Sequence, residues 1–226
     1  MSLPKSLIPF LLLSIIHIIG QFLEITLIHD ASKPLLIPSL GYYFYMSCIR
    51  SPLNKFIYAV LFLSWLGDCF LIFVPVDHLF FLLGLGAFLL AQIVYIIINL
   101  NFVNDGQTRL IFKWPSVLVI LYGMALFLYL VDDLGEMTIP VAIYAAVITM
   151  MGVTAFSRIG RTEHRKAAIM VFLGASSFII SDSIIAINTF SQPLDWAGPF
   201  VMTTYLLAQF LLVTGYLKFI DGLRTA

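Results

Sequence analysis

Long apolar runs separated by short polar breaks occupy most of the 226 residues of this chain. A helix needs roughly 20 mostly apolar residues to cross a bilayer, and eight runs are close to that length. We therefore predict an all-α, polytopic membrane helix bundle of eight transmembrane helices in a single domain, residues 1–226. The expected helices are about 7–27, 34–49, 55–74, 79–100, 114–131, 139–157, 167–188 and 197–219.

Several polar breaks carry a specific expectation. Residues 29–33 are predicted to form a turn, with Pro34 in the first turn of the second helix, a position that suits proline. Residues 101–113 are predicted to form a polar loop, and residues 158–166 a basic loop. Trp65, Trp114 and Trp196 lie near helix ends or in the outer half of a span, which is typical of interfacial anchors.

The composition agrees with a membrane protein. The chain is 61% hydrophobic and 11% charged, whereas soluble domains average about 25% charged residues. The net charge is zero and no basic block occurs, so we expect the lipid bilayer as a partner and no nucleic acid. Compact loops without eukaryotic sorting tails favour a bacterial inner (cytoplasmic) membrane.

Neither a cofactor nor a metal is expected. The two cysteines have no metal-ligand spacing, and a zinc hydrolase would need several histidines on its helices. The adjacent pairs His29–Asp30 and Asp77–His78 are a remaining alternative as metal ligands.

Charge asymmetry between the loops predicts the orientation of the eight helices. One side of the predicted topology has eleven basic residues, and the other side has only Lys33. An excess of Lys and Arg marks the cytoplasmic side, so we predict that both termini are cytoplasmic. The eleven are Lys5, Arg50, Lys55, Arg109, Lys113, Arg158, Arg161, Arg165, Lys166, Lys218 and Arg224.

Two aspartates within apolar runs are the strongest functional signal. Asp68 and Asp182 lie on the third and seventh predicted helices, which run in the same direction. Each precedes the predicted outer end of its helix by six residues, or ~9 Å. Because an intramembrane carboxylate is energetically costly and usually functional, we predict that the two meet in a polar pocket open toward the outer leaflet or exterior. Glu24 and Lys33 fall in the same outer half.

A short repeat relates the two halves of the chain. The sequence Leu-Leu-Ala-Gln occurs at 89–92 and at 206–209, and each copy follows one of the two aspartates. The predicted third and fourth helices and the seventh and eighth are therefore candidates for a 4+4 parallel internal repeat. Chance recurrence in a Leu- and Ala-rich chain remains the alternative.

Several of these segments together resemble the lysoplasmalogenase (YhhN-like) family of integral membrane proteins. Its most specific parts here are Ser-x-x-Gly-Asp at 64–68 and Gly-Ala-x-x-Phe-x-x-Ser-Asp-Ser at 174–183. Further matches are Gly-x-x-Ala-Phe-Leu-x-x-Gln-x-x-Tyr at 84–95, Lys33-Pro34, and Tyr144 followed by Met150-Met151. Gln92 stands where many members of the family have histidine.

The resemblance implies hydrolysis of the vinyl ether bond of lysoplasmalogens to a fatty aldehyde and a glycerophospho-headgroup. Such cleavage needs one protonated carboxyl and one carboxylate, and two buried carboxyls separate into these roles. Asp68 and Asp182 are the expected catalytic pair. Lys33 is expected to bind the lipid phosphate, and the remaining candidates for orienting water or headgroup are Gln92, Tyr95, Tyr144, Gln209, Glu24 and Asn188.

Other interpretations remain open. The aspartates are candidates for a purely structural pair, Lys33 for an interfacial residue that extends to the membrane surface, and Gln92 and Gln209 for hydrogen bonds that join helices. A proton-coupled transporter of a small or lipid-like solute would use the same aspartate pair, although no span shows the paired Gly/Pro interruptions of broken helices. A non-catalytic lipid-binding protein is a further alternative.

Overall fold

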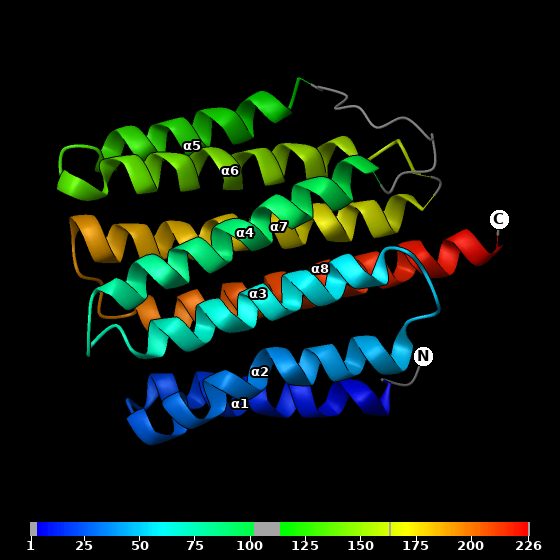
Figure 1. Cartoon of the computed structure of the whole chain (residues 1–226), viewed down its shortest axis with the longest axis horizontal. Helices are drawn as coiled ribbons and strands as arrows, with labels where there is room; N and C mark the ends of the chain where they lie inside the picture. The colour runs from blue at the N-terminus through cyan, green and yellow to red at the C-terminus, as the bar shows by residue number, and fades with distance from the viewer. Residues whose placement is uncertain (1–3, 102–113, 163, 226) are drawn as a thin grey trace. The chain divides into compact units, whose positions relative to one another are not determined.

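The computed structural model describes residues 4–101, 114–162 and 164–225, and within these ranges it contains helices and turns but no strand (Figure 1). The predicted loop 101–113, with Arg109 and Lys113, lies almost entirely outside the described residues. The eight α-helices are α1 Ile8–Phe22, α2 Thr26–Ser47, α3 Asn54–Ile72, α4 Leu79–Asn101, α5 Ser116–Leu130, α6 Thr138–Ser157, α7 Arg165–Ala186 and α8 Ala197–Thr225. Short 3₁₀ turns at Lys5–Leu7 and Gly135–Met137 precede α1 and α6, and a π turn at Ile187–Ser191 follows α7.

Six helical segments in the described part of the chain are long and apolar enough to cross a membrane. They contain α1, α3, α4, α6, α7 and α8. Helix α2 is not among them, because its first half contains several polar residues and the helix includes two prolines. Helix α5 has 15 described residues, which correspond to ~22 Å at 1.5 Å per residue.

The chain divides into two compact units. The first comprises Met1–Val94 and Ile220–Ala226, and the second comprises Tyr95–Phe219. Helices α4 and α8 each contribute residues to both units.

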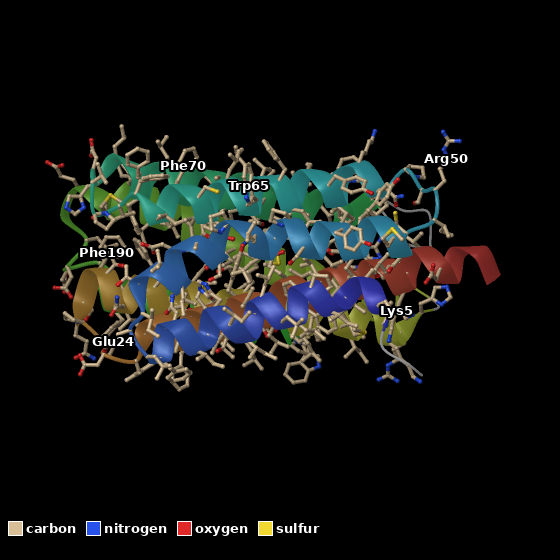
Figure 2. All side chains as sticks on the ribbon, turned by 90° about the horizontal axis from the view of Figure 1, so that it is seen from below. Lys5, Glu24, Arg50, Trp65, Phe70 and Phe190 are labelled. Atoms are coloured by element: carbon tan, nitrogen blue, oxygen red, sulfur yellow. The ribbon has the colours of Figure 1, made fainter. Side chains whose placement is uncertain are left out.

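In the first unit, α1 and α2 form an antiparallel helical hairpin, and α3 packs beside α2 (Figure 1). Helices α3 and α4 approach closely at two glycines. A Cβ atom at Gly67 would lie 2.6 Å from the ring of Phe88, and one at Gly84 would lie 2.9 Å from Leu71. Lys5 and Arg50 lie at one end of this unit and Glu24 lies at the other (Figure 2), as the charge pattern predicts.

The prediction that the second helix begins at Pro34 is wrong. Helix α2 begins at Thr26, so residues 29–33 are helical and Pro34 and Pro38 both lie inside the helix. Proline has no backbone N–H, so Pro38 leaves the carbonyl oxygen of Pro34 without its usual helical donor. The indole Nε1 of Trp65 on α3 donates to that oxygen over 2.9 Å. Trp65 therefore joins α3 to α2, a contact that its interpretation as an interfacial anchor does not include.

In the second unit, small residues allow α5, α6, α7 and α8 to pack closely. A Cβ atom at Gly152 of α6 would lie 2.8 Å from Ile179 of α7, and one at Gly174 of α7 would lie 2.9 Å from the backbone nitrogen of Leu212 on α8. After α7, the side-chain oxygen of Asn188 accepts a hydrogen bond from the Leu194 N–H over 2.8 Å. Asn188 thereby stabilises the turn that leads to α8.

The predicted basic loop 158–166 is partly buried. Arg158, directly after α6, is only 1% exposed. Its Nη1 donates to the Ile98 carbonyl over 3.3 Å, and its guanidinium lies over the rings of Tyr216 and Phe219, 5.6 and 4.7 Å from their centroids. Counting charges did not reveal this burial, because the count assumes that each basic side chain is solvated.

Candidate functional site

Asp182 on α7 contacts Tyr144 on α6. The tyrosine hydroxyl donates a hydrogen bond to Asp182 Oδ2 over 2.5 Å. Beside this pair, the Tyr122 hydroxyl of α5 donates to Ser183 Oγ over 2.9 Å. All four side chains line one small cavity of about 60 Å³, whose other lining residues are mostly apolar. A volume of this size holds one or a few water molecules, given that a water needs about 10–15 Å³ by this measure.

An apolar groove between α5 and α6 continues from this cavity. It has a volume of about 470 Å³ and shares Gly123, Phe127, Ala145 and Thr149 with the Asp182 cavity. Its other lining residues are Ile120, Met124, Ala142, Ala146, Met150 and Val153. The mostly apolar cavity that contains the Asp182 carboxylate thus adjoins a surface suited to a hydrocarbon chain.

Asp68 lies on α3 in the first unit and is 2% exposed. The preceding residue, Gly67, has no room for a side chain because the ring of Phe88 occupies that space. Gln92 follows Phe88 by one turn of α4 and is fully buried. Neither its amide nitrogen nor its amide oxygen has a hydrogen-bond partner among the described residues. An unpaired buried amide is unfavourable, so Gln92 is suited to binding a water or a substrate oxygen.

Asp68 and Asp182 occupy equivalent positions on their helices. Asp68 precedes the end of α3 at Ile72 by 72 − 68 = 4 residues, and Asp182 precedes the end of α7 at Ala186 by 186 − 182 = 4 residues. Both therefore lie ~6 Å from a helix end. They belong to different units, and their pairing stays a prediction.

A polar pocket lies in the first unit where α1 turns into α2. It has a volume of about 390 Å³, and its charged and titratable lining residues are Glu24, His29, Asp30 and Lys33. Glu24 and Lys33 were predicted to lie in the same outer half of the membrane, and the structure places both in this pocket. His29 and Asp30 were considered only as metal ligands, because residues 29–33 were interpreted as a turn.

Two histidines pack against each other at this pocket. The side chains of His29 and Asp30 contact each other, with 2.5 Å between Nδ1 and Oδ1. The buried His17 of α1 lies beneath, with its ring centroid 5.1 Å from that of His29 and its Nδ1 2.8 Å from Ser32 Oγ. No group of three or more His, Cys, Asp and Glu residues is arranged to hold a metal ion in the described parts of the chain.

Two further predicted residues, Tyr95 and Gln209, contact each other. The Tyr95 hydroxyl donates to Gln209 Oε1 over 3.3 Å, and the Tyr95 ring stacks on Tyr216. Both residues are fully buried. This bond connects α4 to α8 within the second unit, as the alternative interpretation of Gln209 proposed, and the binding of water or substrate by this pair stays a prediction.

Comparison with protein families identifies the chain. Residues 28–216 match the model of the YhhN family. The chain belongs to the YhhN family. The matched region contains every segment on which the resemblance was based, from Lys33-Pro34 to the Ser-Asp-Ser of 181–183. The family prediction is therefore confirmed, and this YhhN family member is an integral, multi-pass membrane protein.

Curated relatives carry the name lysoplasmalogenase. The chain is 31% identical over 157 residues to lysoplasmalogenase TMEM86A of Homo sapiens, and the match covers 69% of this chain and 62% of that protein. It is 30% identical over 159 residues to TMEM86A of Bos taurus, with the same coverage. It is 30% identical over 160 residues to lysoplasmalogenase TMEM86B of Homo sapiens, covering 60% of that relative. The chain thus spans less than two thirds of these relatives, and no solved structure matches it.

Proposed function

We propose that this YhhN family member is a membrane hydrolase that cleaves the vinyl ether bond of lysoplasmalogens. The observation that carries this proposal is the short hydrogen bond between Tyr144 and the carboxylate of Asp182, in a cavity that opens onto an apolar groove. The names of the relatives supply the reaction. The substrate is a lysophospholipid taken from the bilayer, and no cofactor takes part in the proposed mechanism.

Asp68 and Asp182 carry out the acid–base chemistry in this proposal. We assign the role of the ionised partner to Asp182, because the Tyr144 hydroxyl donates a hydrogen bond to its Oδ2. Asp68 is the acid and transfers its proton to the β-carbon of the vinyl ether, which leaves an oxocarbenium ion. A water molecule adds to this cation and loses a proton to Asp182.

Collapse of the resulting hemiacetal completes the reaction. The glycerol oxygen leaves with the proton from Asp182, the hemiacetal hydroxyl returns its proton to Asp68, and a fatty aldehyde is released. One water is consumed and both carboxyls regain their starting states. General acid–base catalysis of this kind typically contributes about 10²–10⁴-fold to the rate.

Other parts of the structure suit the substrate. The groove between α5 and α6 is apolar and adjoins the Asp182 cavity, so we assign it to the alkenyl chain. The buried amide of Gln92 is one turn of α4 from Phe88, which packs against the residue before Asp68. We assign Gln92 to the attacking water or an oxygen of the substrate.

The membrane topology is part of the same proposal. We propose that all eight α-helices span a bacterial inner membrane, with both termini cytoplasmic and the aspartates paired in the outer half. The distribution of basic residues supports this orientation. The Leu-Leu-Ala-Gln sequences at 89–92 and 206–209 support a 4+4 parallel repeat within one transmembrane domain.

The test is release of fatty aldehyde from a lysoplasmalogen by the purified protein in detergent. We expect Asp68→Asn and Asp182→Asn each to lower turnover by about 10²–10⁴-fold while the variants still insert and fold. Asp133→Asn, in the exposed turn after α5, is a matched control that keeps normal turnover. Normal turnover in both aspartate variants would refute the proposed hydrolase activity. Proton-driven solute uptake into proteoliposomes, lost with the same substitutions, would instead identify a transporter.

A further inference from the structure

The pocket between α1 and α2 contains unpaired charges of both signs. Asp30 is paired with His29. The side chains of Glu24 and Lys33 form no hydrogen bond or ion pair with any described residue, although both residues line the pocket. A carboxylate and an ammonium group that share one cavity without neutralising each other are suited to a ligand that itself carries both charges.

Lys33 lies farther into the helical hairpin than Glu24 does. Glu24 lies in the turn before α2. Lys33 lies seven residues, or ~10 Å, beyond the start of α2 at Thr26. The α3 residues Leu71 and Ile72 also line the pocket, and they follow Asp68 by one helical turn. Lys33 is therefore the inner charge of the pocket and Glu24 the outer one, and the α3 side of the pocket lies one helical turn from Asp68.

A lysoplasmalogen presents the complementary sequence of groups. Its vinyl ether is followed by the glycerol, then by the anionic phosphate and then by the cationic amine. With the vinyl ether at Asp68, the phosphate extends toward Lys33 and the amine toward Glu24. This match connects the pocket to the proposed reaction.

The backbone of Glu24 gives independent support. Its φ angle is +55°, and among the described residues it is the only non-glycine residue with positive φ. Such a conformation is unfavourable for a residue with a side chain, and strained residues of this kind cluster at functional sites. Glycine would adopt the same turn without strain.

We propose that this pocket binds the phosphoethanolamine head of the substrate, with Lys33 contacting the phosphate and Glu24 the ammonium group; this inference rests on the proposed function. The pocket distinguishes ethanolamine from choline. A primary ammonium donates three hydrogen bonds, whereas a trimethylammonium donates none and is typically held by aromatic residues. The described residues that line the pocket include carboxylates and an imidazole but no Phe, Tyr or Trp.

The experiment compares substrates that differ only in their headgroup. We expect kcat/KM for lysoplasmenylethanolamine to exceed that for lysoplasmenylcholine by about tenfold or more, the effect of one hydrogen bond between charged groups, with the difference in KM. Glu24→Gln should bring the ratio close to one. Lys33→Gln should raise KM for both substrates and leave the ratio unchanged, because both carry the phosphate.

Glu24→Gly separates recognition from a structural role. If Glu24 only shapes the turn, glycine relieves the strain, raises the Tm and leaves the headgroup ratio unchanged, and that result overturns the proposal. If Glu24 binds the ammonium, Glu24→Gly loses headgroup discrimination even though the protein becomes more stable. Asp133→Asn again serves as the control and should keep both the ratio and the Tm.

A binding measurement distinguishes failure of this inference from failure of the proposed reaction. Saturated 1-O-alkyl lysophosphatidylethanolamine and its choline analogue lack the vinyl ether and cannot be cleaved by this chemistry. Their Kd values for the wild-type protein and Glu24→Gln should show the same preference and the same loss. Selective binding without any aldehyde release would support the pocket and refute the hydrolase. Aldehyde release with equal affinity for both headgroups would support the hydrolase and refute the headgroup pocket.

Discussion

Removal of a single hydroxyl group tests the role of Tyr144. Tyr144→Phe keeps the aromatic ring in its place between α6 and α7 and deletes only the donor to Asp182 Oδ2. The surrounding cavity of about 60 Å³ is mostly apolar, so few other groups are present to replace that donor. A hydrogen bond to a charged group contributes about 1.5–3 kcal/mol. Because about 1.4 kcal/mol corresponds to a tenfold change in rate, kcat/KM should fall about 10- to 150-fold.

The assay is aldehyde release from lysoplasmenylethanolamine at saturating and limiting substrate. Two further tyrosines serve as controls. Tyr122→Phe removes the hydroxyl that bonds Ser183 in the same cavity and should reduce kcat/KM only a few-fold, because this bond joins neutral groups. Tyr45 is at an exposed position of α2, so Tyr45→Phe should leave kcat/KM unchanged. Thermal unfolding in detergent confirms that each variant is folded.

The result that would refute this reasoning is equal activity in Tyr144→Phe and Tyr45→Phe. The hydrogen bond would then have no part in the reaction, and the assignment of Asp182 as the ionised partner would lose its basis. A combined variant provides a second check. In an Asp182→Asn background, Tyr144→Phe should have little further effect, because contacting residues that act together are not additive.

Two stability predictions concern packing and burial. Gly174→Ala places a Cβ atom 2.9 Å from the Leu212 nitrogen, so it should lower stability by about 1–3 kcal/mol. A Cβ atom at Gly86 would have no other atom within 4 Å, so Gly86→Ala should raise the Tm slightly. Equal shifts of the Tm in the two variants would contradict the packing of α7 on α8. Arg158→Lys loses the planar contacts with two aromatic rings and should lower stability by about 1–2 kcal/mol. Arg165→Lys, at an exposed position, should leave the Tm unchanged, and a similar loss in both variants would exclude the buried contact as its cause.

Much of the fold was predictable because hydrophobic runs determine where helices lie. Helices α3, α4, α6 and α7 begin and end within a few residues of the predicted bounds. The predicted start of α2 was wrong because Pro34 was placed in the first turn of the helix, where proline is usually found. Inside α2 the lost hydrogen bond is replaced by Trp65, a residue 31 positions away from Pro34. No local pattern contains that information.

The candidate site was likewise predictable only in part. Asp68 and Asp182 were recognisable because a carboxylate in an apolar helix is costly wherever the helix packs. The partner of Asp182 could not be predicted in this way. Tyr144 was selected only by the family resemblance, and its contact with Asp182 depends on how α6 and α7 are rotated about their axes. Hydropathy does not determine helix rotation. For the same reason it did not show that His29 and Asp30 share a pocket with Glu24 and Lys33.

The polarity of α2 has a consequence for how this protein is assembled. In the proposed topology α2 spans the bilayer, yet Thr26–Ser47 is not among the segments that qualify on length and hydropathy. Charged residues make insertion of an isolated helix unfavourable, and the Pro34 carbonyl has its donor only once α3 is in place. In this topology we expect stable insertion of α2 to depend on its neighbours, first on α1 and then on α3.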